Sequence, residues 1–131
     1  MDSTKVAIAT CVGFGLGAAV CWLLVVLIGT RRFRRTRWLG MRTDAITHSA
    51  ETWTVAHEAA LSWISAAAVA ASIASVLGGI SWALGASMQA GEGSGLVGLA
   101  VGGIGVTVSL WAAVTVGNRA AKEIVRREEA G

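Results

Sequence analysis

Three long stretches of the chain contain no charged residue. They lie between Lys5 and Arg31, between Glu58 and Glu92, and between Glu92 and Arg119. Each is longer than the run of about 20 apolar residues that crosses a hydrocarbon layer about 30 Å thick as a helix. Three such stretches within 131 residues leave little sequence for a water-soluble core. They predict an all-α integral membrane protein with three transmembrane helices.

Composition agrees with this prediction. Only 15% of the residues are charged and 54% are hydrophobic, whereas a soluble domain carries about 25% charged residues. A bundle of apolar helices buried inside a larger soluble complex is the alternative, and we disfavour it because helices that are apolar on all sides belong mainly in lipid. The net charge of +3 does not indicate nucleic-acid binding, because the sequence has neither zinc-ligand spacing nor an aromatic and basic stacking platform.

The expected layout is a single membrane domain over residues 1–131. The first apolar stretch is interpreted as a retained helix and not as a signal peptide, because the arginine cluster follows it instead of preceding it. The predicted spans are 6–28, 60–84 and 96–116, with a polar loop at 31–59 and a polar tail at 118–131.

Two pairs of glycines have the small-xxx-small spacing that lets membrane helices approach closely. The pair in the first span is Gly13 and Gly17, and the pair in the third is Gly98 and Gly102. A specific helix contact at either pair is left open by the sequence, because glycine is common in membrane helices generally.

The distribution of positive charge predicts the topology. Ten of the eleven basic residues fall in the loop or in the tail, and Lys5 is the exception. Because basic loops stay in the cytoplasm, the loop and the C-terminus are expected inside and the N-terminus outside. The arginines directly after the first span are expected to contact lipid headgroups, and they are Arg31, Arg32, Arg34, Arg35 and Arg37.

The loop between the first two spans predicts a turn followed by an amphipathic interfacial segment that leads into the second span. Gly40 can supply a turn with positive φ, and Ser49 suits the N-cap of a helix. That helix has no breaker before the second span, so it either continues into the membrane or bends near Ala59. One of its faces should carry residues spaced by i, i+3, i+4 and i+7, which are Trp53, Ala56, His57 and Ala60.

The sequence offers little for catalysis or transport. His57 and Glu58 are the one local acid–base pair, and neighbours in a helix point about 100° apart. We favour His57 as a hydrogen-bonding residue near the membrane boundary. No ionisable residue lies within the predicted spans, which argues against a pump or transporter, although an oligomeric pore stays open. A non-enzymatic protein is therefore expected, with no catalytic residue, no metal site and no cofactor.

One constellation in the loop resembles a known family. Gly40-x-Arg42-Thr43 is followed by Ser49 and then by Trp53-x-x-x-His57. This pattern resembles the signature of the SdpI family of bacterial membrane proteins, of which this chain would contain the three-helix core. The resemblance implies a bacterial plasma membrane location, toxin-peptide immunity or membrane signalling, and one site on the cytoplasmic side, formed by Gly40, Arg42, Thr43, Trp53 and His57.

Two functional hypotheses follow. The first is an SdpI-like, non-enzymatic protein of immunity or signalling. The alternative is a small accessory or structural subunit that packs its small-residue helices against a larger membrane protein complex. The expected partners are the lipid bilayer and then a toxin peptide, a cytoplasmic regulator or that larger complex, while a homo-oligomer stays open. The site residues could equally serve to lock the loop to the membrane surface.

Overall fold

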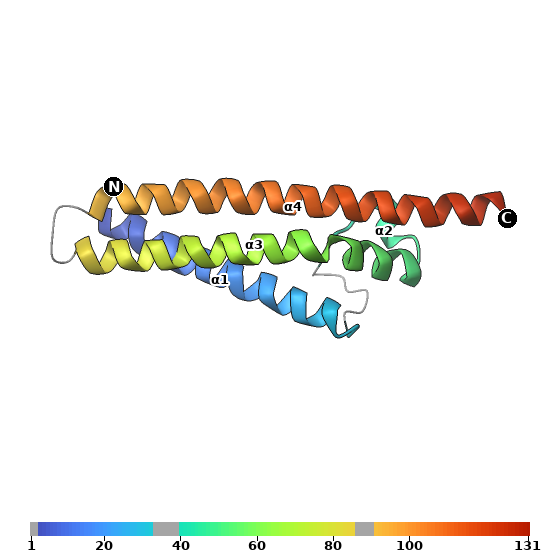
Figure 1. Ribbon diagram of the computed structural model, residues 1–131, viewed down its shortest axis with the longest axis horizontal. Coiled ribbons are helices and arrows are strands. Elements are labelled where there is room, and N and C mark those ends of the chain that lie inside the picture. The colour runs from blue at the N-terminus through green and yellow to red at the C-terminus, as the bar shows by residue number, and fades with distance from the viewer. Residues whose placement is uncertain (1–2, 33–39, 86–90) are drawn as a thin grey trace. The chain divides into compact units, whose positions relative to one another are not determined.

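The computed structural model describes residues 3–32, 40–85 and 91–131 of the chain, and the elements in these ranges are all helices (Figure 1). Three helices are long and apolar enough to cross a membrane. The predicted all-α architecture with three membrane-spanning helices is therefore confirmed. The elements are α1 (Ser3–Gly29), α2 (Asp44–Thr47), α3 (Ala50–Gly85) and α4 (Gly91–Ala130).

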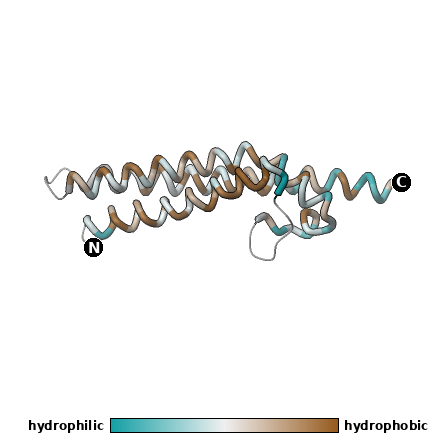
Figure 2. Tube along the Cα trace, turned by 90° about the horizontal axis from the view of Figure 1, so that it is seen from below, coloured by the Kyte–Doolittle hydropathy of each residue, from teal (hydrophilic) through white to brown (hydrophobic). Residues whose placement is uncertain are grey.

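Two of the helices are longer than a bilayer requires. α3 has 36 residues and α4 has 40, which correspond to about 54 Å and 60 Å at 1.5 Å per residue. Hydrophilic residues gather in the C-terminal turns of α4 (Figure 2). Of the two courses predicted for the helix that enters the second span, the structure has the continuous one, because α3 begins in the polar loop and runs to Gly85 as one helix.

Side-chain and backbone caps determine where the helices begin and end. Thr52 N–H donates to Ser49 Oγ over 3.1 Å, and Ser49 N–H donates to Thr52 Oγ1 over 2.9 Å. This reciprocal pair satisfies two backbone donors at the start of α3 in the manner of a capping box, and it confirms the predicted N-cap. α1 ends with Arg31 N–H on Ile28 O at 3.0 Å and Arg32 N–H on Leu27 O at 2.9 Å.

The C-terminal end of α1 has an arginine at a position that is usually glycine. The two hydrogen bonds form a Schellman motif, whose C′ residue adopts a left-handed backbone and is usually glycine. Here that residue is Arg31, with φ of 55°. A left-handed conformation costs a non-glycine residue about 1–2 kcal/mol. The motif nevertheless ends the helix directly after the first apolar stretch.

The described residues form two compact units. The first combines residues 1–21 with 66–108, and the second combines residues 22–65 with 109–131. Each unit contains parts of α1, α3 and α4. The single membrane domain over the whole chain stays a prediction.

In the first unit, α1 meets α3 at very short range. A Cβ added at Gly78 would lie 2.8 Å from the backbone nitrogen of Cys11. Ser75 Oγ donates to Cys11 O over 2.8 Å, and a Cβ added at Gly15 would lie 3.1 Å from that same hydroxyl oxygen. Small residues on both helices therefore allow the backbones to approach closely enough for a hydrogen bond between helices.

Of the two glycine pairs, one lies at a helix contact. In the first unit, a Cβ at Gly98 would lie 3.1 Å from Leu77 Cβ, and a Cβ at Gly102 would collide with Ala74 Cβ. The pair on α4 therefore packs against α3. Added Cβ atoms at Gly13 and Gly17 would meet nothing within 4 Å, so the pair on α1 takes no part in a described contact.

On α3, small apolar residues are buried and large apolar residues are exposed, which is the reverse of the arrangement in a soluble protein. In the first unit, the buried side of α3 consists of Ala67, Ala68, Ala71 and Ala74, which are at most 1% exposed. The exposed side carries Val69, Ile73, Val76 and Ile80, which are 47–61% exposed. Soluble proteins rarely expose contiguous apolar surface of this kind, whereas lipid tails solvate it. The arrangement therefore supports a bilayer around these helices.

We expect Gly78→Ala to destabilise the protein by about 1–3 kcal/mol, because the added methyl group meets backbone atoms that cannot move independently. Gly17→Ala is the matched control: it makes the same change in a helix but has open space around it, so it should be neutral or stabilising by up to about 1 kcal/mol. Unfolding of both variants in detergent micelles, titrated with sodium dodecyl sulfate, measures the difference. Equal midpoints would contradict the close contact at Gly78.

Candidate functional site

The second unit brings the predicted loop residues into contact with the two long helices. Residues 40–57 contain a turn, the short helix α2 and the first turns of α3, and they pack against residues 117–121 of α4. We call these two segments together the cap. All five predicted site residues belong to it.

The turn at Gly40 delivers a backbone donor to His57. Gly40 has φ of 105°, as predicted for a turn residue. Directly after it, Met41 N–H donates to His57 Nε2 over 3.1 Å, while His57 Nδ1–H donates to Trp53 O over 2.7 Å. An imidazole nitrogen that accepts a hydrogen bond carries no proton, so this pattern requires the neutral ring. Protonation at Nε2 would break the bond that holds the turn to α3.

Trp53 forms the apolar centre of the cap. Its side chain is 1% exposed and packs in a cluster with Ile46, Ala56 and Ala121. The Trp53 and His57 rings stack with centroids 4.4 Å apart and planes tilted by 36°. The predicted common face of the helix is confirmed, since Trp53, Ala56, His57 and Ala60 are all buried. Glu51 and Glu58 are exposed, so the segment is amphipathic as expected.

Thr43 connects the loop to α4. Its hydroxyl oxygen caps α2 by accepting from Ile46 N–H at 3.4 Å, and its hydroxyl proton is donated to Asn118 Oδ1 at 2.8 Å. One side chain therefore satisfies a helix terminus and forms a tertiary hydrogen bond. Asn118 lies immediately after the third apolar stretch. A polar side chain at the end of a predicted span was the sequence signal that could have identified this residue. Our sequence interpretation did not include it.

Close approach of α4 also depends on Gly117, which the sequence interpretation likewise did not single out. A Cβ at this position would lie 2.8 Å from Met41 Cε and 3.0 Å from the backbone oxygen of Ala56. Gly117 therefore lets α4 rest on both the turn and α3. No motif marks it, because glycine occurs throughout these helices.

The predicted headgroup-contacting arginines are only partly within the described residues. Arg31 Nε lies 3.4 Å from Glu58 Oε1, with the two side chains 83% and 40% exposed, so this ion pair contributes little to stability. Arg32 is exposed. The remaining three, Arg34, Arg35 and Arg37, lie outside the described residues. Headgroup contact by this cluster stays a prediction.

The chemistry of the cap is mainly that of a structural junction. Gly40 is used for its backbone conformation, Thr43 for capping, Trp53 for packing and His57 for two hydrogen bonds. Arg42 differs because its side chain is exposed. It is therefore the predicted site residue whose charge faces the surroundings of the cap.

Comparison with known proteins adds no assignment: the chain matches no protein-family model, no curated protein and no solved structure.

The hydrogen bond between Thr43 and Asn118 can be measured by a double-mutant cycle. We expect Thr43→Val and Asn118→Ala each to destabilise the protein, with a coupling free energy of about 0.5–1.5 kcal/mol between them. Thr54→Val is the control, because the Thr54 hydroxyl bonds to Ala50 O within its own helix. Thr54→Val and Asn118→Ala should be additive. Additivity of the Thr43 and Asn118 substitutions would show that the bond adds nothing to stability.

Proposed function

We propose that this membrane protein is of the SdpI type and acts, without catalysis, in toxin-peptide immunity or in signalling at a bacterial plasma membrane. The observation that supports the proposal is that the motif residues gather in one cap. Gly40, Thr43, Trp53 and His57 come from separate parts of the loop and of α3, and they hold a single junction together.

Within this proposal the cap presents Arg42 to a partner. The turn at Gly40 and the Thr43 cap lie on either side of Arg42 along the chain, so the backbone that carries it is held at two points. A charged side chain on a held backbone loses less conformational entropy on binding than one on a mobile loop. A carboxylate on a toxin or regulator would be the complementary group, because guanidinium binds carboxylates in a bidentate geometry.

Survival assays test both the function and the role of Arg42. Bacteria that make the chain are challenged with a panel of secreted, membrane-active peptide toxins and compared with cells carrying an empty vector. We expect higher survival with the wild-type chain and a loss of at least tenfold in protection with Arg42→Gln, in cells that contain equal amounts of the two proteins in the membrane. Arg119→Gln removes a charge from another exposed arginine and should keep protection.

Other outcomes would contradict the proposal. If no toxin in the panel distinguishes producing from non-producing cells, immunity is excluded for that panel. If a larger membrane protein co-purifies in fixed proportion instead, the accessory-subunit hypothesis replaces it. Equal protection by the Arg42→Gln variant would assign the cap a purely anchoring role.

The proposed orientation places the cap and the C-terminus in the cytoplasm. It follows from the excess of basic residues in the loop and tail, and it can be tested after replacing both native cysteines with alanine. We expect a membrane-impermeant maleimide to label Thr4→Cys in intact cells, and Glu51→Cys and Glu129→Cys only after lysis. Labelling of Glu51→Cys and Glu129→Cys from opposite sides would refute the orientation.

A further inference from the structure

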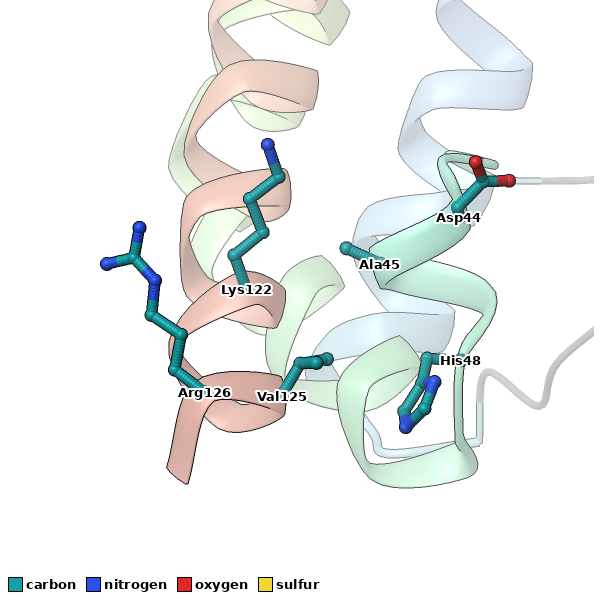
Figure 3. Close-up of a pocket in the computed structure, with 6 residues that line it drawn as sticks. All are labelled: Asp44, Ala45, His48, Lys122, Val125 and Arg126. Carbon is teal, nitrogen blue, oxygen red and sulfur yellow. The ribbon is translucent and has the colours of Figure 1, made fainter. Parts of the chain in front are cut away.

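A pocket of about 300 Å³ lies beside the cap in the second unit (Figure 3). This volume is at the lower end of the range of about 300–1,000 Å³ found for small-molecule sites. α2 and the residue after it contribute one wall and α4 the other, and the lining consists of Asp44, Ala45, His48, Lys122, Val125 and Arg126.

The two walls carry opposite charges at one end of the pocket. Figure 3 shows the Lys122 ammonium and the Asp44 carboxylate directed toward the same end, while the Arg126 guanidinium points away from α2. The aliphatic stems of the two basic residues, with Ala45 and Val125, provide an apolar floor. A ligand whose charges match both walls therefore carries a negative group and a positive group.

That end of the pocket is the one nearer to the third apolar stretch. The hydrogen bond of 2.8 Å from Thr43 to Asn118 holds the neighbouring Asp44 near the end of the third apolar stretch. Lys122 lies about 9 Å beyond Val116 along the helix, and helical side chains lean back toward the N-terminus. With the hydrocarbon boundary at the predicted end of the third span, the Lys122 ammonium reaches the headgroup layer, which adds about 5–8 Å to each face of the hydrocarbon.

Two glutamates of α4 near the pocket each form an ion pair. Glu123 Oε1 lies 3.4 Å from Arg127 Nε, and Glu128 Oε2 lies 3.3 Å from His48 Nε2. Glu123 is thus paired with a residue that does not line the pocket, whereas Glu128 is paired with His48, which does. At the end of the pocket toward which they are directed, a ligand would meet the charges of Lys122 and Asp44.

We propose that this pocket binds the headgroup of a phosphoethanolamine phospholipid. Its phosphate lies against Lys122 and its primary ammonium donates to the Asp44 carboxylate, while the acyl chains continue along α4 into the bilayer. Choline fits less well, because its quaternary nitrogen has no proton to donate to Asp44. Glycerol headgroups offer neutral hydroxyl groups in place of the cation. The proposal is independent of any role in immunity.

Lipid retention by the purified, full-length chain tests the site. The protein is mixed in detergent with equal amounts of phosphatidylethanolamine, phosphatidylcholine and phosphatidylglycerol, and bound lipid is counted by native mass spectrometry. We expect a preference for phosphatidylethanolamine in the wild type and about a fivefold loss of its retention in Lys122→Gln. Arg127→Gln also removes one positive charge, but from a residue that does not line the pocket. This variant should retain phosphatidylethanolamine as the wild type does.

Two further variants separate the pocket from general electrostatics. Asp44→Asn should remove the preference for phosphatidylethanolamine over phosphatidylglycerol while phosphate binding persists. Ala45→Leu fills the floor without changing any charge and should lower retention of phosphatidylethanolamine. Unfolding midpoints within about one degree of the wild type show that these variants are folded.

The proposal is overturned if the wild type retains the three lipids equally, or if Lys122→Gln and Arg127→Gln lose the same amount. It is also overturned if soluble phosphoethanolamine displaces the lipid at equal concentration, because the occupant would then be a free phosphate ester and not a lipid.

Discussion

The constraint on which the whole structure depends is that lipid, not water, surrounds the long helices. In hydrocarbon every backbone amide must be satisfied inside the protein, and only a helix does this within one segment. Lipid also removes the hydrophobic driving force that packs soluble helices together. Close packing must then supply the attraction, and it does so through alanine, serine and glycine. The contact of Gly78 with the Cys11 backbone is the clearest case.

A different principle operates where the helices leave the apolar region. In the cap, backbone and side-chain hydrogen bonds join segments that are far apart in sequence, such as Thr43 to Asn118 and Met41 to His57. Both bonds are partly buried, and hydrogen bonds are stronger in a medium of low dielectric constant. The cap is consequently more specific than the spans. Exchange of one apolar side chain for another on a lipid-facing surface changes little, whereas Thr43 and His57 each have a particular partner.

This division bears on function. Four of the five predicted site residues are occupied in building the cap, so their presence at motif spacing is explained by structure alone. Arg42 is exposed, and a pocket lies between α2 and α4. In the two proposals, Arg42 meets a protein partner and the pocket meets a lipid headgroup. Both proposals therefore use the cap as a platform that holds charged side chains in place.

The sequence by itself determined the helical class, the three apolar spans and the residues of the amphipathic segment. Charge-free stretches, the Ser49 cap and the spacing of Trp53 and His57 are local signals, because each reflects the periodicity or the termini of one helix. Local signals also identified Gly40 as a turn residue. They could not distinguish a glycine pair in contact, Gly98 and Gly102, from one without a contact, Gly13 and Gly17, because both have the same spacing.

Only the tertiary structure decided which segments meet. Asn118 and Gly117 became part of the site because α4 returns past α3 at a particular register, and register depends on the sum of many weak contacts along both helices. The same holds for the pocket, whose walls come from residues 44–48 and 122–126. No periodicity within either segment specifies its distance from the other, since that distance is a property of packing between helices and not of any one of them.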